Sequence, residues 1–250
     1  MNPTETSEAI LIVENIETYI GQFYILEGVS LEVPRNSITV MLGRNGAGKT
    51  TTLKSILGLT PPREGKVVFD GMEIHGKRAY NIANLGIGYV PEHRAIFRQL
   101  SVMENLKLAE RKRGDFNRSA DFIFDLFPDL ERLYKLPGNH LSGGQQQMLA
   151  VARALVPQNK LLLIDEPSEG LAPILIQQMM EAIRKLSETT TVLLVEQNFI
   201  MASQLARDYV IIDDGMSVHN GKMADLVKNE PLVKEYLGAS VGKLVHGGDK

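Results

Sequence analysis

Several residue types are absent or scarce in this chain of 250 residues. It has no cysteine and no tryptophan, aromatic residues make up 6% of it, and its net charge is only −3. The lack of cysteine excludes disulfides and cysteine-ligated zinc or iron–sulfur sites. Sequence-independent binding to nucleic acid depends on dense lysine and arginine, and the chain has no long basic run. We therefore expect no nucleic-acid partner.

Long apolar runs are also missing. The best ones, at 9–13, 161–164 and 192–195, fall well short of the roughly 20 apolar residues that span a bilayer. The stretch from Met1 to Glu8 is polar and lacks the basic-then-apolar order of a signal peptide. Hydrophobic residues still make up 44% of the chain, which is ordinary for a globular protein with a sizeable core. We expect a soluble chain in which any membrane role depends on a membrane-embedded partner.

Strands and helices are expected to alternate over most of the chain. Short apolar or β-branched runs predict strands at 10–13, 29–33, 38–42, 66–69, 161–165, 191–195 and 209–212. Helical spacing predicts helices at 49–57, 145–155, 174–186 and 201–206. Such alternation favours a mostly parallel sheet covered by helices, with a small antiparallel sheet near the Asp70-Gly71 turn.

The middle of the chain has a different character. Apolar residues from Ser101 to Leu136 follow a helical spacing that breaks at Gly114 and Pro128. We therefore predict one domain of class α/β with three parts. Residues 9–94 and 158–237 form the core and an antiparallel β subdomain, and 95–157 form an inserted, mostly helical subdomain. Residues 238–250 are rich in glycine and polar residues and are expected to form a flexible tail.

Residues 43–50 read GRNGAGKT and match the phosphate-binding loop pattern, with a strand before them and a helix after them. Glycines let successive N–H groups point at phosphate oxygens, and the helix N-terminus adds positive charge. Lys49 is expected to reach the β- and γ-phosphates, and the Thr50 hydroxyl is expected to ligate Mg²⁺. The residues predicted to contact the nucleotide here are Asn45, Gly46, Ala47, Gly48, Lys49, Thr50 and Thr51.

An apolar strand ends in two carboxylates at Asp165 and Glu166. Ligands of parallel sheets bind at the carboxyl ends of strands, so these acids should face the phosphate-binding loop. Asp165 is then expected to hold Mg²⁺ through its water shell, and Glu166 to polarise the attacking water.

A third motif, LSGGQ, occupies residues 141–145. Ser142 is a good N-cap, and Gly143 and Gly144 permit close approach of the backbone to an anion. The helix beyond Gln145 directs its positive end at whatever lies over these glycines. This arrangement suits a γ-phosphate delivered by another subunit.

In this order and spacing, GRNGAGKT, LSGGQ and LLLIDEP resemble the nucleotide-binding subunit of ABC transporters, over about residues 9–237. The resemblance implies a P-loop NTPase core that hydrolyses ATP with Mg²⁺. It also implies a head-to-tail dimer with an identical or different ATPase subunit, in which two ATP molecules lie between the phosphate-binding loop and LSGGQ. The dimer would move two transmembrane permease subunits at the cytoplasmic face of the membrane, and would act only indirectly on a substrate-binding protein.

Three positions depart from the common family pattern. Glu92 replaces the usual glutamine near Mg²⁺ and nucleotide, Gln197 replaces a histidine at the γ-phosphate, and Ala172 replaces an aspartate. Gln197 can donate to phosphate but cannot gain a proton near neutral pH. With these changes, VPE, SEGLAP and LVEQN resemble the ATPase subunits of branched-chain amino acid importers and of their urea and amide relatives.

The resemblance implies an adenine-stacking aromatic residue shortly before the second strand. We predict Tyr19 for this role, with Ile20 and Tyr24 as alternatives; otherwise Tyr19 is simply a half-buried loop tyrosine. The five histidines have no metal-ligand spacing. Phe97, in the segment 95–108, is a candidate for contact with a permease or for the core. Two other functions stay open: a soluble ABC-type ATPase acting on the ribosome or DNA, and a module that senses ATP without productive hydrolysis.

Overall fold

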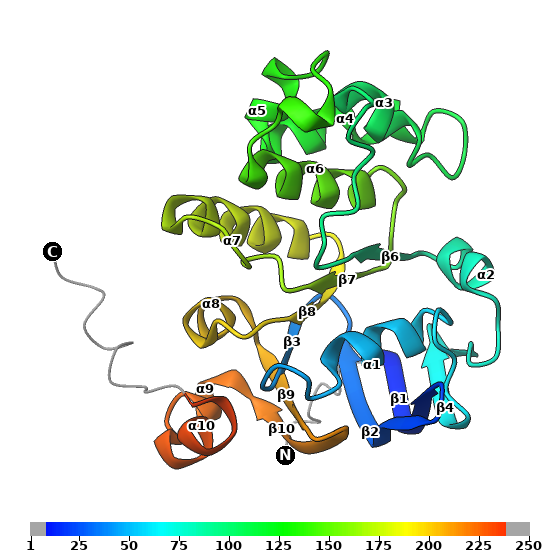
Figure 1. Cartoon of the computed structure of the whole chain (residues 1–250), viewed down its shortest axis with the longest axis vertical. Helices are drawn as coiled ribbons and strands as arrows, with labels where there is room; N and C mark the ends of the chain where they lie inside the picture. Colours follow the sequence, from blue (N-terminus) through cyan, green and yellow to red (C-terminus); the bar gives the residue numbers. More distant parts are fainter. Residues whose placement is uncertain (1–8, 239–250) are drawn as a thin grey trace, which may run out of the picture.

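The computed structural model describes residues 9–238 and contains two β-sheets and a set of helices (Figure 1). The larger sheet has six strands in the order β10-β9-β3-β8-β7-β6. Its strands are β3 (Ile38–Leu42), β6 (Ile87–Val90), β7 (Leu161–Asp165), β8 (Thr191–Val195), β9 (Asp208–Asp213) and β10 (Met216–Lys222). Strands β6, β7, β8, β3 and β9 pair in parallel, and only the edge strand β10 is antiparallel.

The central strands β3, β7 and β8 are buried along their whole length. They are buried because both faces of the sheet are covered, which explains their continuous apolar sequences. Alternate residues of β7 enter two separate cores. Leu161 and Leu163 pack with the smaller sheet and the first helix, whereas Leu162 and Ile164 pack with the helices on the other face.

The smaller sheet is antiparallel, in the order β2-β1-β4-β5. It consists of β1 (Ala9–Ile20), β2 (Phe23–Pro34), β4 (Glu64–Phe69) and β5 (Met72–Glu73). Here the structure corrects the sequence prediction of two short strands with a loop between them. The strands continue through polar residues to a tight turn at Gly21, because one face of this hairpin is exposed and accepts polar side chains.

The helices surround the larger sheet and extend beyond it at one end of the molecule. They are α1 (Lys49–Ile56), α2 (Ala79–Asn84), α3 (Val102–Lys107), α4 (Asp115–Leu126), α5 (Pro128–Arg132), α6 (Gly143–Leu155), α7 (Pro173–Ser187), α8 (Phe199–Leu205), α9 (Met223–Leu226) and α10 (Glu230–Leu237), with a 3₁₀ turn at Gly138–His140. Helices α3 to α6 gather at the top of Figure 1, away from the small sheet.

The structure differs from the sequence predictions in several helical regions. Residues 95–100 form a loop rather than part of a helical segment, and the first helix there begins at Val102, where Ser101 supplies a capping box. Helices α2, α9 and α10 were not predicted. The flexible tail was placed at 238–250, and residues 239–250 lie outside the described residues, as do the polar residues 1–8. None of the helices described within 9–238 has both the length and the apolar character needed to traverse a bilayer.

Candidate nucleotide site

The phosphate-binding loop connects β3 to α1 at the carboxyl edge of the larger sheet. Gly43 has a φ of 152°, and a Cβ there would lie 2.2 Å from the Ile212 carbonyl oxygen. Gly48 is the N-cap of α1 in the left-handed conformation, with a φ of 107°. Only glycine fits both positions, because a side chain would collide with β9 at the first and is strained at the second. The loop therefore curls tightly and leaves the N–H groups at the start of α1 available to an anion.

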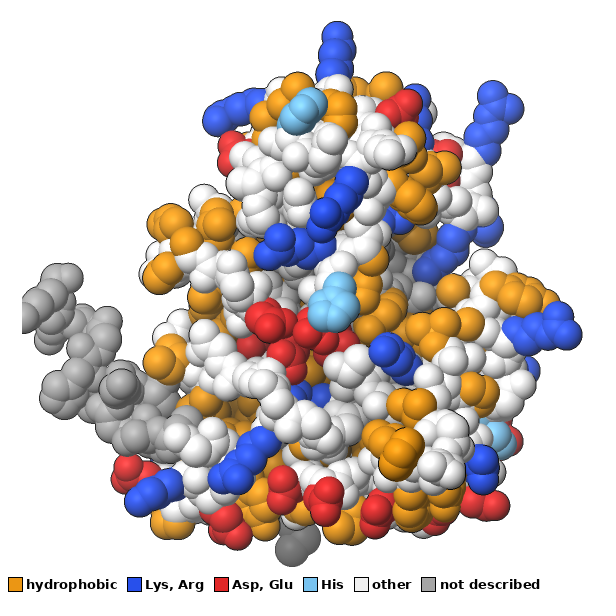
Figure 2. All heavy atoms as spheres, in the orientation of Figure 1, with side chains coloured by type: hydrophobic (Ala, Val, Ile, Leu, Met, Phe, Trp, Pro, Cys, Tyr) orange, Lys and Arg blue, Asp and Glu red, His pale blue; other side chains and the backbone are white. Residues whose placement is uncertain are grey.

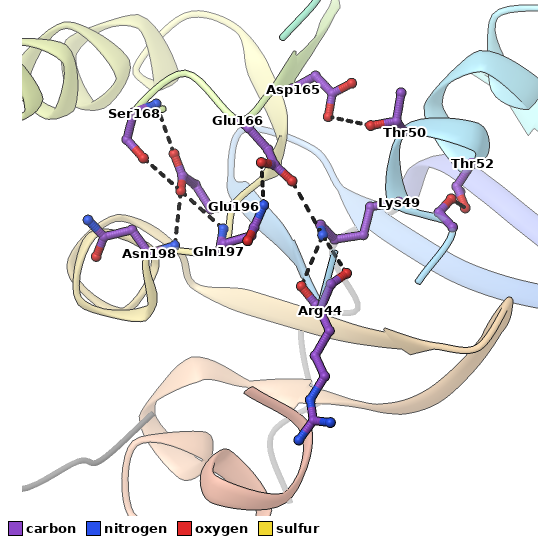
Figure 3. A network of polar contacts seen from close by, with 12 residues as sticks. Arg44, Lys49, Thr50, Thr52, Asp165, Glu166, Ser168, Glu196, Gln197 and Asn198 are labelled. Atoms are coloured by element: carbon purple, nitrogen blue, oxygen red, sulfur yellow. Dashed lines mark hydrogen bonds and ion pairs between the residues drawn. The ribbon is translucent and has the colours of Figure 1, made fainter. Parts of the chain in front are cut away.

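Lys49 lies at the centre of this loop and is only 4% exposed. Its Nζ donates to the carbonyl oxygens of Gly43, at 2.9 Å, and Arg44, at 3.0 Å, and lies 3.3 Å from Glu166 Oε1. Figure 3 shows the ammonium group between the loop and Glu166, which follows β7. These contacts fix a buried positive charge where the loop encloses its ligand.

Asp165 ends β7 and is completely buried. It accepts hydrogen bonds from the Thr50 hydroxyl, at 3.2 Å, and from the Tyr89 hydroxyl, at 3.3 Å. Burial raises the pKa of the Asp165 carboxyl, and the hydrogen bond from Thr50 opposes that rise. Burial likewise raises the pKa of the Tyr89 phenol, so Tyr89 remains a donor to Asp165. Sequence reasoning missed Tyr89, although it lies in the Tyr-Val-Pro stretch before Glu92.

The Thr50 hydroxyl and the Asp165 carboxylate are hard oxygen donors of the kind that Mg²⁺ prefers. Among residues 9–238, no group of three or more acidic, histidine or cysteine side chains could enclose a metal ion. The pair formed by the Thr50 hydroxyl and the Asp165 carboxylate fits Mg²⁺ better than most cations, because Mg²⁺ commonly keeps several waters and takes its other ligands from phosphates.

Glu166 follows Asp165 with a φ of 45°, a conformation that is uncommon for residues other than glycine. One of its carboxylate oxygens faces Lys49, and the other accepts a hydrogen bond from the Gln197 side-chain amide. The left-handed backbone turns Glu166 sharply out of the strand, so consecutive acids serve different partners. The structure thus brings together the predicted catalytic residues Lys49, Glu166 and Gln197.

A cavity of about 300 Å³ lies above this cluster. Figure 2 shows acidic side chains gathered near the middle of this face of the molecule. The lining of the cavity contains most of the predicted contacts and two residues that were not predicted, Ile25 and Glu169. The complete lining is Ile25, Asn45, Gly46, Gly48, Lys49, Thr50, Thr51, Glu92, Glu166, Glu169 and Gln197. Of the predicted loop residues, Ala47 is buried beside the cavity rather than lining it.

The LSGGQ turn lies elsewhere in the chain. The Ser142 hydroxyl accepts from the Gln145 N–H at 3.3 Å, and the Gln145 side chain accepts from the Ser142 N–H at 2.9 Å. This capping box begins α6, as the sequence predicts. A Cβ on Gly144 would lie 2.3 Å from Leu175, so the glycine allows α6 to approach α7 closely. None of Ser142, Gly143, Gly144 and Gln145 lines the cavity.

Tyr19 is not brought to the cavity either. It pairs with Tyr24 across the hairpin, their rings stack at 4.5 Å, and Arg63 lies 4.3 Å from the Tyr19 ring. The preceding residue, Thr18, bonds to Ser55 of α1, so Tyr19 lies on the opposite face of the strand. A register shift after Thr18 leaves Ile25 unpaired, and Ile25 lines the cavity instead. The geometry gives no support to Tyr19 or to Tyr24 as the adenine-stacking residue.

A parallel sheet with a glycine loop before α1 and two acids at the end of another strand of the same sheet defines a P-loop protein that binds nucleoside triphosphates. Residues 26–169 match the protein family described as "ABC transporter". The high-affinity branched-chain amino acid transport ATP-binding protein BraG of Pseudomonas aeruginosa is 39% identical, over 92% of this chain and 100% of its own length.

A second relative and two solved structures are also similar to most of this chain. The probable branched-chain amino acid transport ATP-binding protein LivF of Archaeoglobus fulgidus is 36% identical, over 87% of this chain and 94% of its own. Among solved structures, the ADP conformation of the ATP-binding cassette MJ1267 has a TM-score of 0.80 and 26% identity, covering 96% of this chain and 99% of that one. A dimeric post-hydrolysis state of the cassette MJ0796, bound to ADP and Pi, has a TM-score of 0.76 and 26% identity, covering 85% and 98%. The chain belongs to the ABC transporter family and is an ATPase of that family.

Proposed function

We propose that this chain is the energy-coupling ATPase subunit of an importer for branched-chain amino acids. The observation that carries the proposal is the joint position of Lys49, Thr50 and Glu166 at one cavity, in a chain similar to the branched-chain amino acid transport ATP-binding proteins BraG and LivF. The resemblance of the motifs around Glu92 and Gln197 to the same branch supports it.

The proposed chemistry is transfer of the γ-phosphoryl group of ATP to water. Residues from Asn45 to Thr51 and the start of α1 hold the phosphates, and Lys49 offsets their negative charge. Glu166 polarises the attacking water, and Gln197 donates to the γ-phosphate from the side of β8. The adenine would lie toward the apolar side chain of Ile25.

Mg²⁺ would be held by the Thr50 hydroxyl, by Asp165 through the water shell of the ion, and by Glu92. When bound, it neutralises charge that develops on the phosphate oxygens. The chain itself contributes two oxygen ligands, and the Thr50 hydroxyl already donates a hydrogen bond to the Asp165 carboxylate at 3.2 Å. Tyr89 keeps the second oxygen of Asp165 oriented.

The partner that completes the site would be a second ATPase subunit, identical or different. Ser142, Gly143, Gly144 and Gln145 of each subunit would cover the nucleotide held by the other. Two features support this: the capped N-terminus of α6 is built to receive an anion, and it does not line the cavity of its own chain. The dimeric state of the similar cassette MJ0796 also supports it.

We place the complex at the cytoplasmic face of the membrane, with two permease subunits and, indirectly, a substrate-binding protein. The α/β core at 9–94 and 158–237 would carry the nucleotide, and the part at 95–157 would carry the LSGGQ turn and the permease contact. Phe97, 49% exposed with the Arg153 guanidinium 4.8 Å from its ring centre, is our candidate for that contact.

The test is reconstitution of the chain in liposomes with its permeases, the second ATPase subunit and the binding protein. Leucine should stimulate both uptake and ATP hydrolysis. Glu166→Gln should lower the turnover number by at least about 100-fold, because it removes the general base. Glu188→Gln, the same change at an exposed position outside the cavity, should leave turnover unchanged.

Other outcomes would redirect the proposal. Stimulation by urea or an amide, and not by leucine, would change the substrate. A rate of ATP hydrolysis that does not depend on the permeases would favour the soluble ATPase. The lack of any hydrolysis would favour the ATP-sensing module. Unchanged turnover in Glu166→Gln would remove the proposed role of that carboxylate.

A further inference from the structure

Glu196 is a buried carboxylate to which the chemistry above gives no role. It follows β8, directly before Gln197, and is 1% exposed. Its own backbone N–H donates to the Met41 carbonyl of β3, at 3.2 Å. This bond fixes the backbone of Glu196 in the interior, where the adjacent strands β3, β8 and β7 end side by side.

Four hydrogen bonds converge on this carboxylate. Oε1 accepts from the Ser168 backbone N–H at 3.2 Å, and Oε2 accepts from the Ser168 hydroxyl at 3.0 Å. Oε2 also accepts from the backbone N–H groups of Gln197 and Asn198, each at 3.1 Å. All four partners are donors, so the site is built for an acceptor-only group.

No cation pairs with Glu196 among residues 9–238. Burial raises the pKa of the Glu196 carboxyl, and the bonds from Ser168 and Asn198 oppose that rise. Glu166 is the nearby charged group that disfavours ionisation further. An acid buried without a cation is costly, so its four donors must offset the loss of water.

The donors come from two loops that also carry the reacting side chains. Ser168 lies in the loop after β7, just beyond Glu166, and Asn198 lies in the loop after β8, just beyond Gln197. A second connection between the same loops is the hydrogen bond from the Gln197 side chain to Glu166. Figure 3 shows the two connections side by side.

We propose that Glu196 is a positioning residue that locks the loop after β7 to the loop after β8, so that Glu166 and Gln197 face the same phosphoryl group. This rests on the proposed function of that site. Glu196 touches neither the cavity nor Lys49, so it acts only through the residues that it holds.

The substitution that tests this is Glu196→Gln, which keeps the shape but turns one acceptor oxygen into a donor facing donors. ATP hydrolysis is measured in the assembled complex, and nucleotide binding and thermal unfolding are measured on the purified chain. We expect turnover to fall by about 10- to 100-fold, since small misplacements of reacting groups have effects of that size. The dissociation constant for ADP should change little, and Glu188→Gln again serves as the control.

A double-mutant comparison separates positioning from general damage. In a Glu166→Gln background, Glu196→Gln should lower the remaining turnover by less than about threefold, because one of the two residues that it positions no longer acts. An equal loss in both backgrounds, or unchanged turnover in Glu196→Gln alone, would overturn the inference. If Glu196→Gln fails to fold, Ser168→Ala carries the test, with an expected loss of about 3- to 10-fold for one missing hydrogen bond; unchanged turnover in Ser168→Ala would then overturn the inference.

The two proposals fail in different ways. A wild-type complex in which leucine changes neither uptake nor hydrolysis would contradict the importer function. A wild-type complex that works, with a Glu196→Gln variant of equal turnover, would contradict only the positioning role.

Discussion

The phosphate-binding region and the LSGGQ turn are organised in opposite ways. In the phosphate-binding region, Lys49, Asp165 and Glu196 are buried. Each of them contacts a residue distant in sequence, through a hydrogen bond or an ion pair. In the second, Ser142 and Gly143 are exposed, and the capping bonds join only neighbours. One chain therefore contains a buried, connected set of polar side chains around its cavity and a separate capped helix start with an exposed surface.

This difference indicates where each region obtains its rigidity. The phosphate-binding region is rigid because buried charges need fixed partners. The LSGGQ turn is held locally because its capping box satisfies the N–H groups of Ser142 and Gln145, and its exposed residues leave an open surface. The following substitutions test that contrast, from the largest expected effect to the smallest.

Lys49→Ala should disable the first region completely. It removes the buried cation and leaves Glu166 without its ion-pair partner, so we expect nucleotide affinity to fall at least about tenfold and ATP turnover by about 100-fold or more. Affinity is measured by titration of the purified chain with a fluorescent ATP analogue. Lys54→Ala, an exposed lysine on the same helix, is the control. Retained affinity in Lys49→Ala would mean that the loop backbone alone holds the phosphates.

Ser142→Arg should separate the two regions. A bulky cation at the cap disturbs the surface that would meet the partner's nucleotide, so turnover of the assembled complex should fall by about 10- to 100-fold. Affinity of the purified chain for nucleotide should remain within about twofold, because the turn does not line the cavity. Asn139→Arg adds the same charge at an exposed position nearby and should have little effect. Equal loss of affinity and turnover would contradict the independence of the two regions.

Gly144→Ala should have the smallest effect, on stability. Its Cβ would lie 2.3 Å from Leu175, whereas a Cβ on Gly143 would meet only the end of the Arg94 side chain at 3.0 Å. We expect Gly144→Ala to be less stable than Gly143→Ala by about 1–3 kcal/mol, the usual cost of overpacking. Urea unfolding monitored by circular dichroism measures the difference. Equal stability of the two variants would show that Leu175 moves aside without cost.

Local sequence patterns were sufficient for some features and not for others. The apolar runs at 161–164 and 192–195 were sufficient to predict β7 and β8, since both faces of a central parallel strand are buried. The predicted N-cap at Ser142 is confirmed, although the helix expected at 145–155 begins two residues earlier, at Gly143. The long hairpin of β1 and β2 was underestimated, because polar residues on its exposed face interrupt the apolar pattern.

Tyr19 and Ile25 show why the base-binding end of the site was harder to predict. The prediction of Tyr19 rests on the family resemblance, which implies an aromatic residue shortly before the second strand. A single extra residue in β2 changes which side chains face each way, and sequence spacing does not reveal where that bulge falls. The same limit applies to Glu196, whose partner Ser168 is 28 residues away and adjoins it only through strand pairing.

The amino-acid sequence by itself determined the chemical groups and their local shapes: the glycine curl before Lys49, the paired acids at 165–166 and the capped turn at Ser142. These depend on backbone conformation and on hydrogen bonds between near neighbours, which short motifs specify. Only the tertiary structure decided that Asp165 meets Thr50 and Tyr89, that Ile25 rather than Tyr19 borders the cavity, and that Glu196 joins two loops. These contacts depend on strand order and register, which are set by how the whole sheet packs.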